Sequence, residues 1–298
     1  MLVKHKEVQV LKKINSFILI GGDTRQLYMA DYFESLGYKV SIYGLPDKGR
    51  ENIYDLRKTI NEYDAVVLPL PVTKDEKKIY SLVPMKETID DIISLLTNNH
   101  TVFAGMINKN TEAKLKKKTS DIYDYFKRED VTVMNTIPTV QGILKAMIEN
   151  IEYTIHSSEC AVFGYGRVAR ITADVLKSLG ANVTVCARKS GDIATAFTNG
   201  YNGVYISDFY KQANKYDILI NTVPALVIDK KILNNLKKDC LIIDVASSPF
   251  GTDFAYAYEA GINAIQCSSL PGKVAPKSAG KIIADGILNI IKEGNENE

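Results

Sequence analysis

The sequence predicts an α/β protein built from two doubly wound parallel-sheet domains. Short apolar runs alternate with amphipathic helical patterns along the whole chain, which is typical of parallel sheets. One apolar run, at 159–163, leads into a glycine-rich turn, so a second domain begins near the middle of the chain. With 298 residues, the chain is long enough to bury two separate cores.

In the first domain we expect five strands with helices between them. The predicted strands are 16–20, 39–43, 64–70, 101–104 and 131–134, and the predicted helices are 25–36, 53–63, 85–96 and 111–127. Each strand segment is a short apolar run, whereas the helical segments repeat their apolar residues every three or four positions.

In the second domain the predicted strands are 159–163, 183–187, 204–206, 218–221, 241–244 and 263–266. A helix at 138–150, with Pro138 in its first turn, leads into this domain. A second amphipathic helix, at 278–292, returns to the first domain, and the tail 293–298 is expected to fray. We therefore predict a first domain at 1–150, completed by 278–298, and a second at 151–277. Two linking helices imply a cleft between the domains, where a small molecule would bind.

Composition and charge are those of an ordinary globular protein. Hydrophobic residues make up 46% of the chain, charged residues 24%, and the net charge is +2. A charge this small gives no reason to expect a nucleic acid or a membrane as a partner. No apolar run approaches the roughly 20 residues that span a bilayer, and no signal peptide is evident. The four cysteines are scattered without the spacing of a zinc site. We expect a cytoplasmic protein without a metal site or a disulfide framework.

The most specific motif lies between Ala161 and Ala169, where a strand runs into the order G-x-G-x-x-A and a helix follows. This is the opening of a Rossmann-like dinucleotide-binding unit. Gly164 is expected to make the tight turn, and Gly166 to let a pyrophosphate approach the backbone at the helix N-terminus. The neighbouring residues in the turn are predicted to contact the cofactor as well: Tyr165, Arg167 and Val168.

The end of the next strand predicts which cofactor is preferred. Enzymes that bind NAD usually carry an acid there, which meets the ribose 2′-hydroxyl. This chain has Arg188, Lys189 and Ser190 instead. These donors suit a 2′-phosphate, so we predict NADP, with NAD as the alternative.

Two further strand ends should lie along the cofactor. Thr222, Val223 and Pro224 follow the strand 218–221 and are expected to line the nicotinamide ribose. Asp244 ends the strand 241–244. It either meets the nicotinamide ring or the substrate, or it braces its own loop.

Candidate substrate residues lie in the first domain and at the end of the second. Asp23, Thr24 and Arg25 open a helix directly after a strand, so the helix terminus and Arg25 could bind a carboxylate. Asp23 is as well explained as an N-cap as it is as a catalytic acid. Thr73 follows another strand, and Lys277 and Ser278 lie near the start of the returning helix. Lys277 is the best cation for binding substrate, and it could act as general base if it is buried.

Eight segments, in order along nearly the whole chain, carry a resemblance to one family. They are 20–27, 68–76, 135–142, 155–169, 181–188, 220–227, 241–254 and 270–280. With these segments the chain resembles the A subunits of dipicolinate synthase. Its second domain is also similar to the cores of alanine dehydrogenase and related dehydrogenases.

The resemblance implies oxidation of dihydrodipicolinate to dipicolinate, with hydride transfer to NADP, in the mother-cell cytoplasm during sporulation. The precursor would come from the lysine pathway, and a flavoprotein-like B subunit would work with this chain. A dicarboxylate substrate needs two anchors, for which Arg25 and Lys277 are the candidates, one from each side of the cleft. Thr24, Thr73 and Ser278 could add hydrogen bonds. As general base we favour Lys277, then Asp23, then an ordered water.

Two other functions remain open at this stage. The chain could be another NADP-dependent dehydrogenase of a small carboxylic acid, or a dinucleotide-binding subunit without turnover of its own. Self-association into a homo-oligomer is also left open by the sequence.

Overall fold

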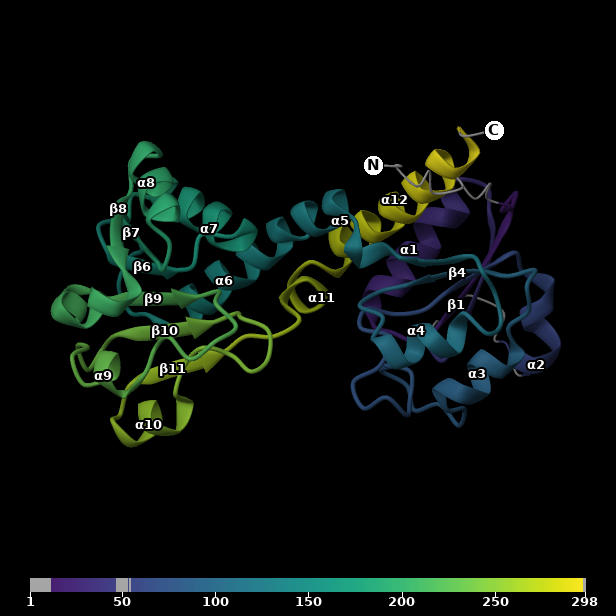
Figure 1. Cartoon of the computed structure of the whole chain (residues 1–298), viewed down its shortest axis with the longest axis horizontal. Helices are drawn as coiled ribbons and strands as arrows, with labels where there is room; N and C mark the ends of the chain where they lie inside the picture. Colours follow the sequence, from purple (N-terminus) through teal and green to yellow (C-terminus); the bar gives the residue numbers. More distant parts are fainter. Residues whose placement is uncertain (1–11, 47–52, 54, 297–298) are drawn as a thin grey trace, which may run out of the picture. The chain divides into compact units, whose positions relative to one another are not determined.

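A computed structural model describes residues 12–46, 53 and 55–296 (Figure 1). The chain divides into two compact units, one formed by Met1–Asn135 with Ala275–Glu298 and the other by Thr136–Val274. We call them unit 1 and unit 2. The sequence-based boundary at 150 had assigned the helix α6 (Thr136–Asn150) to the first domain, whereas the structure groups it with unit 2. The reason is packing, because Ile143 and Met147 of α6 are buried in the core of unit 2.

Unit 1 is built on a five-stranded parallel sheet in the order β2-β1-β3-β4-β5. The strands are β1 (Ser16–Ile20), β2 (Lys39–Tyr43), β3 (Ala65–Val67), β4 (Thr101–Ala104) and β5 (Ile122–Asp124). The α-helices are α1 (Thr24–Ser35), α2 (Leu56–Thr59), α3 (Ile89–Leu95), α4 (Lys109–Leu115), α5 (Glu129–Met134) and α12 (Pro276–Asn295). Short 3₁₀ helices occupy Ile60–Glu62 and Tyr125–Lys127. The strand order reverses between β1 and β3, and ligands of such sheets bind at the carboxyl ends of the strands there.

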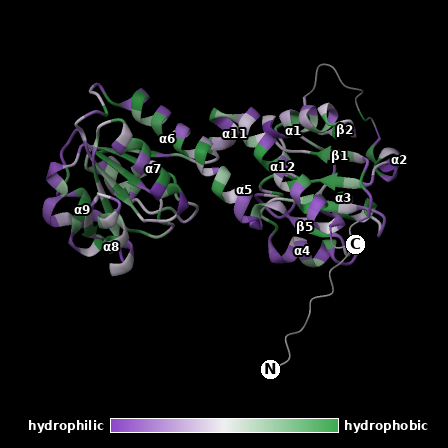
Figure 2. Ribbon diagram, turned by 90° about the horizontal axis from the view of Figure 1, so that it is seen from above, coloured by the Kyte–Doolittle hydropathy of each residue, from purple (hydrophilic) through white to green (hydrophobic). Residues whose placement is uncertain are grey.

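Each face of this sheet has its own core. One core joins the sheet to α1 and α12, and the other joins it to α2, α3 and α4. Figure 2 shows the apolar strands of the sheet with polar residues on the surrounding helices. The doubly wound arrangement predicted for the first domain is therefore confirmed.

The fifth strand of unit 1 was wrongly placed. Residues 131–134 were predicted as a strand but belong to the helix α5, and β5 lies inside the segment predicted as the helix 111–127. In α5 only Val131 is buried, whereas Val133 and Met134 are 42% and 48% exposed. The apolar run is thus a helix with one buried face. β5 is a three-residue edge strand that pairs with β4 alone, so its local pattern is too short to recognise.

The returning helix α12 completes unit 1. Ile283, Ala284 and Ile287 are buried in the same core as Phe17 and Phe33. The helix runs to Asn295, so the expectation that the chain frays from residue 293 is wrong for 293–295. Glu293 accepts two hydrogen bonds from the guanidinium of Arg128, at 2.7 and 2.8 Å, which holds this last turn in place.

Unit 2 contains a six-stranded parallel sheet in the order β11-β10-β9-β6-β7-β8. The strands are β6 (Glu159–Phe163), β7 (Asn182–Ala187), β8 (Asn202–Tyr205), β9 (Ile218–Asn221), β10 (Leu241–Asp244) and β11 (Asn263–Gln266). All six were predicted, with boundary shifts of at most two residues. The helices are α6, α7 (Arg167–Ser178), α8 (Ser190–Thr198), α9 (Lys230–Leu233), α10 (Phe254–Glu259), α11 (Leu270–Val274) and the 3₁₀ helix η3 (Ile206–Lys215). The strand order reverses between β6 and β9, as in dinucleotide-binding domains.

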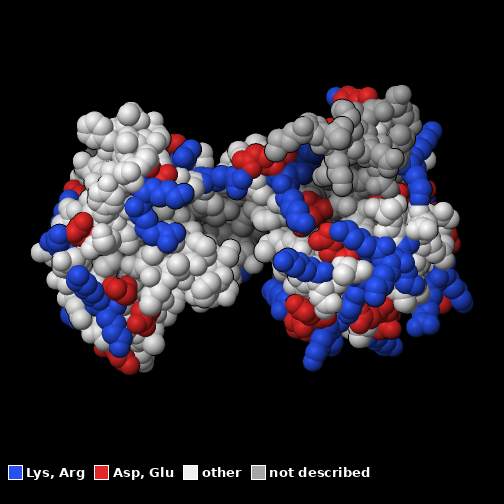
Figure 3. All heavy atoms as spheres, in the orientation of Figure 1, with Lys and Arg blue, Asp and Glu red and all other residues white. Residues whose placement is uncertain are grey.

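Surface charges of both signs are interspersed on the face seen in Figure 3. Within the described residues, no helix combines the length and the apolar character that a membrane span requires.

Candidate functional site

The turn after β6 requires glycine at position 164. Gly164 has a φ of +97°, and its amide donates to the carbonyl of Cys186. A β-carbon at this position would lie 2.6 Å from Thr222 Oγ1 and 3.1 Å from Val223 Cγ2. Any other side chain would therefore collide with the loop that follows β9, so Gly164 lets the two central strand ends approach each other.

Gly166 serves a different purpose. Its φ is −80°, which any residue adopts, and a β-carbon there would meet nothing within 4 Å. Gly166 is the N-cap of α7, and no side chain of the described residues caps this helix end. Uncapped amides and a positive helix dipole beneath open space form a cradle for an anion, and a β-carbon would fill it. The turn thus fits the pyrophosphate of a dinucleotide.

The loop after β9 is held rigidly against this turn. Thr222 Oγ1 donates to the carbonyl of Phe163 at 2.8 Å, and the buried Asn221 amide both accepts from and donates to the backbone of Val223. Val223 is half-buried and Pro224 is exposed. The three residues predicted to line the nicotinamide ribose therefore form one braced loop at the strand-order reversal.

Asp244 has a structural role in this unit. Its side chain is fully buried, and its oxygens accept hydrogen bonds from Ala246 N, Gly251 N and Thr252 Oγ1 at 2.8–3.0 Å. These bonds brace the loop after β10, which was the alternative to a contact with the nicotinamide ring.

A surface pocket of about 550 Å³ lies beyond the end of β7. Arg188 lines it, together with residues that follow β8 and β9. Lys189 occupies the N-cap position of α8 and Ser190 is the first residue of that helix. All three predicted 2′-phosphate ligands are exposed, so their donors can reach a bound anion.

In unit 1, Arg25 is not free to receive a ligand with its whole guanidinium. Its Nε and one terminal nitrogen donate to the two carboxylate oxygens of Asp23, each at 2.8 Å, and the same terminal nitrogen donates to the carbonyl of Leu70. Both side chains are buried. Burial alone would lower the pKa of Arg25, but the hydrogen bond and charge of Asp23 outweigh it and raise that pKa. Asp23 also caps α1 through the amide of Arg25. Asp23 is therefore the N-cap of α1, one of the two roles predicted for it.

The remaining candidates of unit 1 are more accessible. Gly280 lets the first turn of α12 pack on α1, because a β-carbon there would lie 2.4 Å from the carbonyl oxygen of Arg25. This contact brings Lys277 and Ser278, which are both exposed, to the same region as the half-buried Thr24. The burial that a general-base role for Lys277 required is absent.

The hydroxyl of Thr73 is used within its own loop. It accepts from the amides of Asp75 and Glu76 and lies 3.2 Å from Asp75 Oδ1. Thr73 thus shapes the turn after β3, and its predicted hydrogen bond to substrate would compete with these contacts.

Sequence reasoning missed two tyrosines at this sheet edge. The fully buried Tyr125 donates to the carbonyl of Leu68 at 3.0 Å, and the hydroxyl of Tyr80 lies 3.5 Å from Asp23 Oδ2. Burial raises the pKa of Tyr80. Neither residue is part of a local motif, so only the fold places them beside the Asp23–Arg25 pair.

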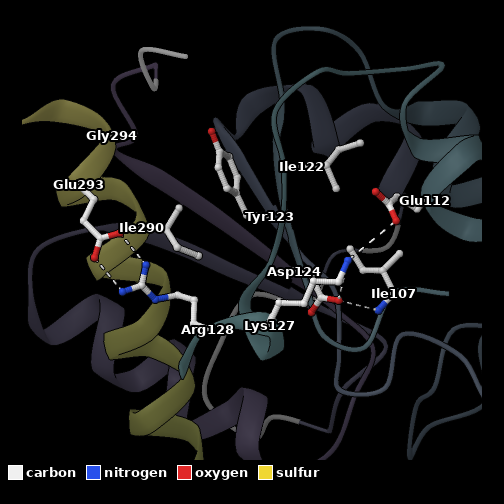
Figure 4. A pocket seen from close by; sticks show the side chains of 10 residues that line it. All are labelled: Ile107, Glu112, Ile122, Tyr123, Asp124, Lys127, Arg128, Ile290, Glu293 and Gly294. Carbon is white, nitrogen blue, oxygen red and sulfur yellow. Dashed lines mark hydrogen bonds and ion pairs between the residues drawn. The ribbon is translucent and has the colours of Figure 1, made fainter. Parts of the chain in front are cut away.

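Unit 1 also has a pocket, of about 430 Å³, which is formed by β5, α4 and the end of α12 (Figure 4). Charged groups of this pocket already have partners. Arg128 donates to Glu293 and Asp130, and Asp124 accepts from the backbone amides of Met106 and Ile107. It contains none of the predicted site residues. We therefore do not assign the functional site to it.

These features define the class of protein. The elbow between β6 and α7, set in a two-unit parallel-sheet fold, is that of a dinucleotide-dependent oxidoreductase. Residues 154–287 match the model of the acetohydroxy acid isomeroreductase NADPH-binding domain. The crystal structure of the transhydrogenase from Sinorhizobium meliloti is similar in fold, with 14% identity, a TM-score of 0.67 and 93% of each chain covered.

The chain belongs to the family of dipicolinate synthase A subunits. Residues 16–126 match the model of the N-terminal domain of these proteins. The chain is 32% identical over 288 residues to the dipicolinate synthase A subunit of Bacillus subtilis (strain 168), covering 92% of this chain and 95% of the relative. The crystal structure of the A subunit from Bacillus halodurans gives a TM-score of 0.82 at 33% identity, covering 93% of this chain and 97% of the other. Membership in a family of A subunits implies a partner subunit, and the resemblance read from the sequence is confirmed.

Proposed function

We propose that this chain oxidises dihydrodipicolinate to dipicolinate in the cytoplasm of the sporulating cell, together with a B subunit. The observation that carries the proposal is the intact dinucleotide elbow, Gly164 to Gly166, in a member of the A-subunit family. The overall balance is dihydrodipicolinate plus NADP⁺ giving dipicolinate, NADPH and one proton. Bound NADP supplies a nicotinamide that accepts the hydride.

Unit 2 supplies the binding of the cofactor. The backbone at Gly166 and the start of α7 hold the pyrophosphate, while Arg188, Lys189 and Ser190 favour a 2′-phosphate. The loop Thr222–Pro224 lies along the ribose of the nicotinamide. The braces at Asn221 and Asp244 support this site because they fix the loops in place before ligand binds.

Unit 1 supplies the binding of the dicarboxylate. Lys277 and Ser278 lie at the start of α12 and Thr24 at the start of α1, and these helices pack together at Gly280, so the helix dipoles there also favour an anion. Arg25 orients this region through Asp23 and Leu70 and offers its remaining donors to a second carboxylate. Since Asp23 is committed to Arg25 and the exposed Lys277 lacks the burial that a general base requires, we assign Lys277 to binding the carboxylate, and an ordered water is the proton acceptor that remains. Aromatisation of the ring favours the products, so orientation of the substrate is the main task of the protein.

The test is an assay of the lysine-pathway precursor with NADP, with and without the B subunit, that follows both NADPH and the ultraviolet absorbance of the aromatic pyridine diacid. We expect Lys277→Ala to lower kcat/KM about tenfold or more, the size of one charge-assisted hydrogen bond to a substrate carboxylate. Its NADP affinity should stay close to that of the wild type. Lys281→Ala is the matched control, because Lys281 lies one turn further along α12 and binds Asp285 and Tyr32.

Two results would redirect the assignment. Near-normal turnover in Lys277→Ala removes that residue from the mechanism. Oxidation of a different carboxylic acid, or no turnover even with the B subunit, favours the other dehydrogenase or the non-catalytic subunit. Arg25→Ala is a poorer probe, since removing one partner of a buried ion pair costs about 3–5 kcal/mol of folding free energy.

A further inference from the structure

The pocket beside Arg188 contains a second cation that no local motif indicated. Arg188, directly after β7, and Lys231, from α9, both line this pocket. Other lining residues come from the end of β8 and from the segments after β8 and β9: Tyr205, Ser207, Tyr210, Leu226 and Val227. Side chains separated by more than forty positions in the sequence thus face one volume of about 550 Å³.

Lys231 is held in place by an aromatic ring. Its Nζ lies 3.4 Å from the centroid of Tyr210, a close cation–π contact. This contact orients the ammonium but leaves its charge uncompensated. Among the residues that the structure describes, neither Lys231 nor Arg188 has a carboxylate within ion-pair distance.

The acids near Lys231 are already engaged. Asp208 binds Lys211, and this hydrogen bond is the main cause that lowers the pKa of Asp208, with a smaller contribution from the charge of Lys231. Asp229, which also lines the pocket, accepts the amide of Ile232 at 3.1 Å as the N-cap of α9. Two cations without an ion pair among the described residues therefore line a pocket whose one carboxylate, that of Asp229, accepts a backbone amide.

We infer that Lys231 is a second determinant of NADP specificity, which binds the 2′-phosphate together with Arg188. The inference rests on the proposed function, because it assumes that the dinucleotide lies across the Gly164 elbow. A 2′-phosphate carries a charge near −2, so two cations that line the same pocket bind it better than one. The uncharged 2′-hydroxyl of NAD gains little from either, so Lys231 raises the preference for NADP rather than the affinity for dinucleotides in general.

Binding of two adenosine fragments to the full-length chain separates these effects. Isothermal titration calorimetry compares adenosine 2′,5′-bisphosphate with adenosine 5′-monophosphate, which lacks the 2′-phosphate. We expect Lys231→Gln to lower the affinity for the bisphosphate about tenfold, the size of one charge-assisted hydrogen bond. The affinity for the monophosphate should fall less than twofold. Lys231→Arg should retain most of the affinity for the bisphosphate.

Lys230→Gln is the matched control. Lys230 is the neighbouring exposed lysine of α9 and also lies over an aromatic ring, 4.8 Å from the centroid of Tyr256, but it does not line the pocket. It should leave both affinities unchanged. Equal weakening of both fragments by Lys231→Gln, or the same loss in Lys230→Gln, would overturn the inference, because a general charge effect would then explain the result.

Failure of the inference is distinct from failure of the proposed function. If the wild type prefers the bisphosphate and Lys231→Gln keeps that preference, Lys231 is not a determinant, while Arg188 and the proposed reaction stand. If Lys231→Gln loses the preference but dihydrodipicolinate is not oxidised, the inference holds and the proposed reaction fails. A wild type that binds both fragments equally contradicts the choice of NADP and the role of Lys231 together.

Discussion

At the scale of single residues, the two glycines of the elbow separate folding from ligand binding. Gly164 is required by the protein itself, since its positive φ and the 2.6 Å approach to Thr222 Oγ1 exclude a side chain. Gly166 meets no protein atom, so the fold does not require glycine there. The open space above Gly166 fits a ligand that comes close to the backbone.

This contrast gives a prediction about two substitutions. Gly164→Ala should lower the free energy of unfolding by about 1–3 kcal/mol, the usual cost of a strained φ. Gly166→Val should leave the melting temperature within a degree or two but weaken dinucleotide binding by about tenfold or more, because its side chain fills the cradle. Thermal unfolding and NADP titration of both variants measure the two effects. Undiminished NADP affinity in Gly166→Val would rule out a pyrophosphate at this turn.

At the scale of secondary-structure elements, the contact between α5 and α12 shows how unit 1 is closed. Arg128, at the N-cap of α5, binds Asp130 and Glu293, and Asn289 of α12 donates to Asp130. Beneath this network, Val131 packs against Gly286, where a β-carbon would lie 2.1 Å from Val131 Cγ2. A polar network at the rim and a close apolar contact below it thus join helices about 150 residues apart.

The network predicts a pH dependence for unit 1. The hydrogen bond from Arg128 is the main cause that lowers the pKa of Asp130 to about 2. Since the folded pKa lies below the unfolded value near 4, the ionised carboxylate stabilises the fold fully above about pH 4, and this contribution is lost as the pH falls toward 2. The Asp130 side chain is 39% exposed, so solvent screening limits the contribution to about 1 kcal/mol or less.

Urea unfolding of the wild type and of Asp130→Asn between pH 7 and pH 2 measures this contribution. The variant should be less stable at neutral pH, and the difference should shrink as the pH approaches 2. Asp285→Asn provides a comparison, because it removes the exposed ion pair between Asp285 and Lys281, which both lie on α12. A difference for Asp130→Asn that stays constant across this range would contradict the assigned cause.

At the scale of the whole molecule, the chain consists of two units with separate cores. Unit 1 is assembled from both ends of the described chain, whereas unit 2 is continuous. All residues proposed to bind the dinucleotide belong to unit 2, and all those proposed to bind the dicarboxylate belong to unit 1. The stabilising effects of the two ligands should therefore be separable.

Hydrogen exchange of the full-length chain with and without NADP tests this separation. At a hundredfold excess over the dissociation constant, a ligand stabilises the folded state by about 2.7 kcal/mol. We expect slower exchange in the core strands β6, β7 and β9, and unchanged exchange in β1, β3 and β4. Equal protection of both sets would show that the cofactor stabilises unit 1 as well, and the division of roles between the units would have to be abandoned.

Local patterns in the sequence determined much of this protein. The G-x-G-x-x-A order, the basic residues after β7 and ten of the eleven strands are readable along the chain, since each depends on backbone conformation or periodicity within a few residues. The family resemblance was readable too, because its segments follow one another in order. The misplaced strand β5 shows the limit, as three half-buried edge residues carry too little periodicity to compete with the helical segments on either side.

Only the tertiary structure decided which charges are available and which are already used. Asp23 and Arg25 looked like an open anion site, yet Asp23 and Leu70 occupy two of the three guanidinium nitrogens of Arg25, so only the remaining nitrogen is left for a ligand. Asp244 lies at a strand end suited to a ligand but is consumed by its own loop. Conversely, Lys231 has no motif around it. It lines the same pocket as Arg188 because the parallel strands β7 and β9 have their carboxyl ends at the same edge of the sheet. Pairing and burial depend on residues far apart in sequence, so no local pattern records them.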